Sequence, residues 1–195
     1  MPRVSEAHLA ARRQQILDAA ARCFTRNGFH QTSMQDVIKE ARLSVGAFYR
    51  YFRSKNELIT AIATEKISAV TGVLDELLEV EPMPPIASVL EQVLEIVDGA
   101  VDEGGPIQIA VQVWGEAVHD PEVGAIVADI YGRVRDRAVR TAERAQATGQ
   151  LPPDADPAGI GAAFFGLVQG YILQRILLGT VDRRLYMNGV RALLA

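Results

Sequence analysis

The sequence has 195 residues, of which 49% are hydrophobic and 23% are charged, and it contains a single cysteine. This composition excludes a disordered chain and an intramolecular disulfide framework, and the length allows a substantial hydrophobic core. The net charge of −4 is unevenly distributed, because residues 1–56 carry +6 and the remaining residues carry −10. A basic N-terminal segment on an acidic body indicates that the N-terminal segment binds a polyanion.

Helical periodicity dominates the sequence, whereas the alternation typical of β-strands is almost absent. The expected fold class is therefore all-α. Capping residues, glycine and proline mark the helix ends, and a turn is expected at Gly104-Gly105-Pro106. The predicted helices are 7–27, a second capped by Thr32 or Ser33, a third capped by Ser44, 55–80, 87–101, 107–118, 122–148, 157–179 and a last one from Asp182 to the C-terminus.

The segment from Thr32 to Leu58 predicts two short helices joined by a tight turn at Arg42-Leu43. Thr32 and Gln35 have the spacing of a capping box for the first of these helices, and Ser44 is expected to cap the second. Two short helices joined in this way form the helix-turn-helix motif, whose second helix enters the major groove of DNA.

The N-terminal segment carries a further set of residues that fit a known pattern: Ile16-Leu17-Asp18-Ala19-Ala20, Phe24, Gly28-Phe29, Thr32-Ser33, Asp36-Val37-Ile38, Ala41, Leu43-Ser44, Gly46, Phe48-Tyr49, Phe52, Ser54-Lys55 and Leu58. In these residues the chain resembles the tetracycline-repressor (TetR) family of bacterial transcriptional regulators. The rest of the chain matches only in helical layout and in loops such as His119-Asp120-Pro121. The resemblance implies an N-terminal three-helix DNA-binding domain with a helix-turn-helix, followed by a C-terminal helical domain for ligand binding and dimerisation.

Contacts to phosphates position a protein on DNA, and contacts to base edges specify the sequence. Hydroxyl and ammonium groups in this segment suit phosphates, and small apolar side chains at the start of the recognition helix suit thymine methyl groups. Phe48 and Phe52 are expected to pack in the core, whereas the resemblance implies that Tyr49 and Lys55 contact DNA. The predicted DNA-binding residues are Thr32, Ser33, Ser44, Val45, Gly46, Ala47, Tyr49, Arg50, Tyr51 and Lys55.

Two positions depart from the family pattern. Arg42 stands in the turn where the family often has glycine, and a left-handed backbone there would cost an arginine about 1–2 kcal/mol. Tyr51 stands where the family often has histidine, and its phenol can still donate to a phosphate. The turn is therefore expected to differ slightly, and the phosphate-binding role of Tyr51 is expected to survive.

Small residues recur on one face of the predicted helix 157–179, where Gly159, Ala163, Gly166 and Gly170 are spaced by four, three and four residues. Such a stripe lets another helix approach closely, which offsets the low helix propensity of glycine. The alternative is ordinary packing within one subunit. The family resemblance favours a homodimer that forms through the two C-terminal helices across a two-fold axis.

The body also contains polar and aromatic side chains on helices that are expected to enclose a cavity. A mostly apolar pocket with a few convergent polar groups is typical of a site for a small organic effector. Core packing is the alternative for each residue taken alone. The predicted ligand-binding residues are Gln108, Gln112, Trp114, Tyr131, Phe165 and Gln169, with His119 as a further candidate.

The sequence contains no Ser/His/Asp set, glycine-rich phosphate loop or Cys/His cluster, so neither an enzyme nor a cofactor is expected. Glu116 and His119 have the Glu-x-x-His spacing of a di-iron ligand pair, but such a site needs two pairs, so no metal is expected. The apolar segment from Gly159 to Gly179 is long enough to cross a bilayer, yet two glutamines and an arginine within it argue against a membrane span. Without an apolar signal region at the N-terminus, a cytoplasmic protein is expected.

Together these features predict a dimeric, ligand-responsive transcriptional repressor. Residues 1–56 are expected to form the helix-turn-helix DNA-binding domain, and residues 57–195 the effector-binding and dimerisation domain. The expected partners are a palindromic double-stranded DNA operator, a small organic effector that releases the operator and a second copy of the chain. The alternative is a helical-bundle interaction or metal-binding protein that does not bind DNA, which leaves the basic N-terminal segment unexplained.

Overall fold

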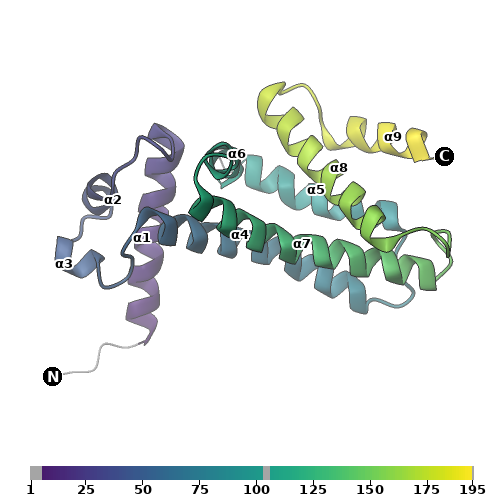
Figure 1. Ribbon diagram of the computed structural model, residues 1–195, viewed down its shortest axis with the longest axis horizontal. Helices are drawn as coiled ribbons and strands as arrows, with labels where there is room; N and C mark the ends of the chain where they lie inside the picture. The colour runs from purple at the N-terminus through teal and green to yellow at the C-terminus, as the bar shows by residue number, and fades with distance from the viewer. Residues whose placement is uncertain (1–5, 103–105, 195) are drawn as a thin grey trace. The chain divides into compact units, whose positions relative to one another are not determined.

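The computed structural model describes residues 6–102 and 106–194, and every regular element in these ranges is a helix (Figure 1). This confirms the all-α fold class. The predicted turn at Gly104-Gly105 lies outside the described residues. The helices are α1 (Glu6–Asn27), α2 (Met34–Glu40), α3 (Val45–Phe48), α4 (Lys55–Glu79), α5 (Ile86–Asp102), α6 (Pro106–Ala117), α7 (Pro121–Ala147), α8 (Pro157–Leu177) and α9 (Arg183–Leu194).

The chain divides into two compact units, to each of which α4 and α7 contribute. Unit 1 consists of residues 1–65 and 104–127, and unit 2 consists of residues 66–103 and 128–195. Unit 1 therefore extends past residue 56 into α4 and also includes α6. The functional division of the chain at residue 56 stays a prediction.

Unit 1 is built on the apolar face of α1, which packs against α2 and α6. Side chains at the helical period along this face are fully buried: Ile16, Ala19, Ala20, Cys23 and Phe24. Burial raises the pKa of the Cys23 thiol, which suits a structural side chain rather than a reactive one. Phe48 and Phe52 are buried in the same core, which confirms the prediction that both point inward.

The cap of α2 is Ser33 rather than Thr32. The hydroxyl oxygen of Ser33 accepts a hydrogen bond from the Asp36 N–H at 3.2 Å, and the Asp36 carboxylate accepts one from the Ser33 N–H at 2.9 Å. These two bonds complete a capping box, and hydrogen bonds from Ser33 lower the pKa of Asp36. The predicted capping box of Thr32 and Gln35 is wrong, because the Thr32 side chain is buried instead of flanking the helix.

The turn between α2 and α3 is a Schellman motif that contains Arg42. The N–H of Arg42 donates to the Lys39 carbonyl at 3.0 Å, and the N–H of Leu43 donates to the Ile38 carbonyl at 3.3 Å. This motif requires a left-handed backbone at Arg42, whose φ is 54°. Because arginine has a Cβ atom, this left-handed backbone lowers the stability of the fold by about 1–2 kcal/mol.

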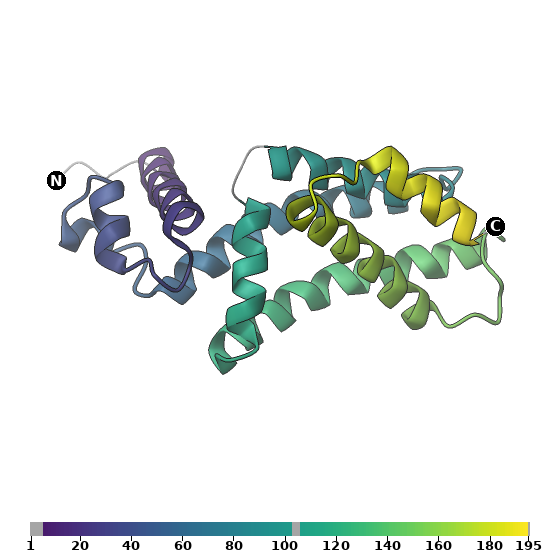
Figure 2. The same cartoon turned by 90° about the horizontal axis from the view of Figure 1, so that it is seen from above.

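In unit 2, α5 packs against both α8 and α9 (Figures 1 and 2). The Asp98 carboxylate on α5 accepts a 2.5 Å hydrogen bond from the Tyr171 hydroxyl and lies 3.2 Å from Arg175 on the same helix as Tyr171. Arg183 of α9 lies 3.8 Å from Asp98 and 3.0 Å from Glu95. One carboxylate of α5 is thus bound by groups from both α8 and α9.

Helices α7 and α8 approach closely at Gly161. A Cβ atom added there would lie 2.7 Å from Val139 Cγ2 and 2.9 Å from the Val139 backbone nitrogen, so this position requires glycine. The rings of Tyr131 and Phe165 also connect these helices, with centroids 5.2 Å apart and planes inclined at 74°.

Candidate DNA-binding interface

The helix-turn-helix exposes one face of α3 while the core of unit 1 holds the other face. Val45 is 49% exposed and Tyr49 is 39% exposed, whereas Phe48 is fully buried. The rings of Phe48 and Tyr49 meet edge to face with centroids 5.8 Å apart, which restrains the exposed tyrosine ring. An anchored helix with an exposed face has the geometry required to enter a major groove.

The start of α3 presents small residues. Ser44 caps the helix, because its hydroxyl oxygen accepts a hydrogen bond from the Ala47 N–H at 3.3 Å. Ser44 and Gly46 are exposed, Ala47 is half buried, and the space around a Cβ atom added at Gly46 is open. Base edges can therefore approach the backbone of this turn closely.

Two further predicted contacts, Ser33 and Arg50, are also exposed. The acidic Glu40 on α2 is engaged within the unit, with its carboxylate 2.9 Å from Arg22 and 3.3 Å from Arg26. These two guanidinium groups hold the pKa of Glu40 below its usual range. The negative charge of Glu40 is therefore neutralised by two arginines of α1.

The structure places Thr32 away from the surface, in contrast to the predicted phosphate contact. Thr32 is 1% exposed, and its hydroxyl lies 2.8 Å from the Gly28 carbonyl oxygen and 3.2 Å from the Cys23 carbonyl oxygen. The Thr32 hydroxyl therefore contacts backbone carbonyls of α1 and of the residue that follows it, instead of facing solvent.

Lys55 is also placed differently from the prediction. Its ammonium donates to the backbone carbonyls of Phe29 at 2.8 Å, His30 at 3.2 Å and Thr32 at 3.2 Å. Burial lowers the pKa of Lys55, and the ammonium lies 4.6 Å from the centroid of the Phe29 ring. Because an ammonium has three hydrogens, these bonds use its full donor capacity and leave none for a phosphate.

The segment between α1 and α2 is also bound by α6. The Phe29 N–H donates to the side-chain oxygen of Gln112 at 2.8 Å, and His30 Nδ1 lies 3.3 Å from Glu116. Gln112 was predicted to bind a ligand, yet the structure engages its oxygen in this contact. No sequence pattern predicts this contact, because Phe29 and Gln112 are 83 positions apart and share no motif.

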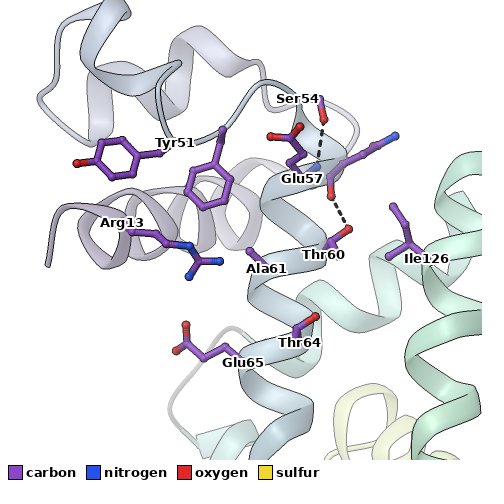
Figure 3. A pocket seen from close by; sticks show the side chains of 11 residues that line it. Arg13, Tyr51, Ser54, Glu57, Thr60, Ala61, Thr64, Glu65 and Ile126 are labelled. Carbon is purple, nitrogen blue, oxygen red and sulfur yellow. Dashed lines mark hydrogen bonds between the residues drawn. The ribbon is translucent and has the colours of Figure 1, made fainter. Parts of the chain in front are cut away.

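A groove of about 620 Å³ opens in unit 1 between residues of α1, the segment that leads into α4, α4 itself and Ile126 of α7 (Figure 3). The half-buried Tyr51 lines this groove together with Arg13 and Glu65. Arg13 also lies 5.4 Å from the centroid of the Phe52 ring, at the edge of the core. This groove was not predicted, because segments far apart in the sequence form its walls.

The six predicted ligand-binding residues belong to both units: Gln108, Gln112 and Trp114 lie on α6 in unit 1, and Tyr131, Phe165 and Gln169 lie on α7 and α8 in unit 2. Gln108 is exposed, and Trp114 is half buried. The structure brings Tyr131 and Phe165 into ring contact, and burial raises the pKa of the Tyr131 phenol.

No three His, Cys, Asp or Glu side chains gather as metal ligands would within residues 6–102 and 106–194. Glu116 of the Glu-x-x-His pair lies beside His30, and His119 is exposed.

Helix α8 is long and apolar enough to cross a membrane. Within the described chain, 22% of its most apolar window is buried. Three of the four residues of the predicted small-residue stripe, Gly159, Ala163 and Gly166, are exposed. The fourth, Gly170, faces α9, because a Cβ atom added there would lie 3.4 Å from the Tyr186 hydroxyl. Large apolar side chains at the end of α8 and beyond it are also exposed, namely Leu177, Leu178, Leu185 and Leu193.

An anchored recognition helix joined to an all-α body defines a helix-turn-helix transcriptional regulator rather than an enzyme. Residues 16–62 match the family described as bacterial regulatory proteins, tetR family, and residues 85–195 match the family of the BetI-type transcriptional repressor, C-terminal. The second match alone spans more than half of the sequence. The chain belongs to the TetR family of bacterial transcriptional regulators.

Among its relatives, the HTH-type transcriptional regulator UidR of Escherichia coli is 26% identical over 182 residues, which cover 93% of this chain and 90% of the relative. The HTH-type transcriptional repressor Rv1474c of Mycobacterium tuberculosis is 44% identical over 75 residues, or 37% of this chain and 40% of the relative.

Solved structures share the fold. Salmonella enterica GusR has a TM-score of 0.78 at 23% identity and covers 99% of this chain and 97% of its own. FadR from Bacillus subtilis, solved in complex with stearoyl-CoA, has a TM-score of 0.73 at 17% identity. The match covers 93% of this chain and 96% of the FadR chain.

Proposed function

We propose that the chain is a ligand-responsive repressor that binds a palindromic operator as a homodimer and is released by a small organic effector. The observation that carries this proposal is the exposed face of α3, where Val45 and Tyr49 flank the buried anchor Phe48. Residues 1–56 serve as the DNA-binding domain, and residues 57–195 serve as the effector-binding and dimerisation domain. The protein acts in the cytoplasm, where the bacterial chromosome is accessible.

The proposed contacts with DNA follow the exposed surface of the helix-turn-helix. Val45, Gly46 and Ala47 contact base edges, because their small size suits thymine methyl groups and a close backbone approach. The residues proposed to contact the phosphate backbone are Ser33, Ser44, Tyr49, Arg50 and Tyr51, of which Arg50 also suits a guanine edge. Thr32 and Lys55 contribute from inside the unit, by holding the segment that precedes α2.

The second copy binds through α8 and α9. The support for this interface is the exposed stripe of Gly159, Ala163 and Gly166, together with exposed Leu185 and Leu193 on α9. Exposed apolar residues of this kind are typical of a protein–protein interface. Pairing it with its own copy across a two-fold axis forms a four-helix contact, which accounts for the apolar character of α8 without a membrane.

The effector site lies in the body. The Tyr131–Phe165 ring pair, with Gln169 one turn further along α8, suits an organic molecule that is mostly apolar and carries a few polar groups. A bound acyl-coenzyme A in the FadR structure supports an organic effector as the class of ligand. On α6, Gln112 couples this helix to the segment that precedes α2, because its side-chain oxygen accepts a hydrogen bond from the Phe29 N–H.

The test starts from a randomised duplex library. The wild-type protein is expected to enrich a near-palindromic sequence whose half-site centres lie about 34–36 Å apart, or a multiple of that distance. A small-molecule screen then monitors Trp114 fluorescence with and without this duplex. An effector should bind the free protein more tightly than the duplex complex, with a coupling of roughly 1–3 kcal/mol. A library that yields no enriched sequence would contradict the proposed function.

A further inference from the structure

Arg42 combines an unusual backbone conformation with an exposed cationic side chain. Its φ of 54° lies in the left-handed region, at the position of a Schellman motif that glycine usually occupies. The other positive φ values among the described residues belong to glycines, at positions 28, 149 and 179. In this part of the chain, arginine therefore takes a place that glycine takes elsewhere.

Contacts from two helices force this conformation. The Leu43 N–H donates to the Ile38 carbonyl at 3.3 Å, and the Gln15 side chain of α1 donates to the Ala41 carbonyl at 2.8 Å. A strained residue persists where the surrounding structure determines its backbone, and such residues concentrate at functional sites. The turn is thus fixed independently of the Arg42 side chain.

The Arg42 side chain does not stabilise the fold through any contact that the described residues provide. It is exposed, and its guanidinium has no hydrogen bond, ion pair or ring contact within the part of the chain that the structure describes. The nearby acid Glu40 is already bound by Arg22 and Arg26. Neither burial nor pairing inside the described chain accounts for an arginine here.

The position of Arg42 beside the recognition helix explains why an arginine stands in this turn. One residue separates Arg42 from Ser44, the cap of α3, so no more than about 7 Å of backbone joins the two. The first residues of a recognition helix lie at the base edges, and the phosphates that border the groove pass beside them. A guanidinium at this point can donate two parallel hydrogen bonds to a phosphate.

We propose that Arg42 binds a DNA phosphate, and that the interface retains this arginine although its backbone conformation weakens the fold. The inference rests on the proposed operator binding. A phosphate contact adds affinity for every sequence, releases one counterion and leaves the sequence preference unchanged.

The experiment compares Arg42→Gly, Arg42→Asn and Arg42→Lys with the wild type, on a fluorescein-labelled duplex that the wild-type protein selects from a randomised library. Glycine and asparagine tolerate the left-handed backbone and remove the charge, whereas lysine keeps both the strain and the charge. Arg42→Gly is expected to raise the Tm by about 2–4 °C. Because the proposed dimer carries two copies of Arg42, both neutral variants should weaken binding about ten-fold per contact, or about a hundred-fold, and lower the slope of log Kd against log salt by about 1.8. Arg42→Lys should keep the wild-type slope.

The control is Arg135→Gln, which removes an exposed charge from α7 in unit 2 and should leave the salt slope unchanged. Neutral variants with wild-type affinity and slope would overturn the phosphate contact, and so would a changed sequence preference at an unchanged slope. An Arg42→Gly variant without a raised Tm would overturn the cost to the fold. A wild-type protein that selects no duplex would instead overturn the proposed function, and the inference with it.

Discussion

The backbone N–H of Phe29 donates a hydrogen bond of 2.8 Å to the side-chain oxygen of Gln112. Phe29 lies in the segment between α1 and α2, and Gln112 lies on α6, so this bond joins the helix-turn-helix to a helix of the proposed effector domain. Gly28, which precedes Phe29, has a φ of 85°, and a Cβ atom added there would lie 3.8 Å from the same oxygen. A displacement of α6 would therefore act directly on the backbone that leads into α2.

Replacing Gln112 with leucine should destabilise unit 1. The half-buried Phe29 N–H would lose its acceptor, which costs about 1–2 kcal/mol and lowers the Tm by about 2–8 °C. Differential scanning calorimetry measures the change. Gln112→Glu keeps an acceptor oxygen, and Gln108→Leu makes the same change at an exposed position of α6. Equal Tm values for Gln112→Leu and Gln108→Leu would show that the bond contributes nothing.

Lys55→Met should lower stability and leave the salt dependence of DNA binding as it is. The variant leaves three carbonyls without their charged donor, at a cost of about 2–3 kcal/mol. Fluorescence anisotropy at several salt concentrations should give the wild-type slope, whereas Arg50→Gln removes one contact from each copy of the proposed dimer and should lower the slope by about 1.8. If Lys55→Met lowered the slope of log Kd against log salt and left the Tm unchanged, Lys55 would be a phosphate contact and would not stabilise the fold.

Gly166→Leu should separate the two copies of the proposed dimer without unfolding them. A Cβ atom at Gly166 meets nothing within 4 Å in its own chain, so a leucine projects into the proposed interface. Sedimentation velocity should show a dimer for the wild type and a monomer for this variant. Gly99→Leu, on α5, introduces the same side chain at an equally open and exposed glycine and should remain dimeric. A dimeric Gly166→Leu would place the interface elsewhere.

Alkaline pH should destabilise unit 2 through Tyr171. Burial and the hydrogen bond to Asp98 raise the pKa of its phenol above the ordinary value of 10. The unfolded chain then loses the proton near pH 10 while the folded chain retains it, so stability is complete below that pH and falls as the pH rises further. Tyr171→Phe should cost about 1 kcal/mol at neutral pH and make the alkaline decline shallower.

Urea unfolding at a series of pH values from neutral to beyond 10 measures this decline. The flattening in Tyr171→Phe should be partial, because burial also raises the pKa of Tyr131. An identical decline in wild type and Tyr171→Phe would mean that the phenol of Tyr171 titrates alike in both states.

Helices and caps could be predicted where they depend on local patterns. The start of α8 follows such a pattern, because Pro157 fits the first turn of a helix and the Asp156 carboxylate caps it by accepting a hydrogen bond from the Ala158 N–H at 3.0 Å. The same reasoning left Thr32 and Ser33 open as caps of α2. Burial of Thr32 beneath the end of α1 decides that choice, and burial depends on packing that a local pattern does not contain.

Contacts between distant segments could not be predicted from the sequence. Lys55 follows the recognition helix, where a cation suits a phosphate, yet its acceptors lie 23 to 26 residues earlier. Arg137 belongs to a run of arginines on α7 whose pattern is typical of a solvated face. Its guanidinium instead lies 3.0 Å from the carboxylate of Asp75 on α4. In both cases the tertiary fold supplies the partner.

The close contact at Gly161 and the hydrogen bond from Tyr171 together fix the rotation of α8 about its own axis. Val139 leaves no room for a Cβ atom at the first position, and Asp98 holds the second. The stripe that contains Ala163 and Gly166 therefore keeps one orientation relative to α5 and α7, and in the proposed dimer a partner helix would meet it at one crossing angle. A change in quaternary geometry would have to carry α8 as a rigid rod, because rolling the helix would break both contacts.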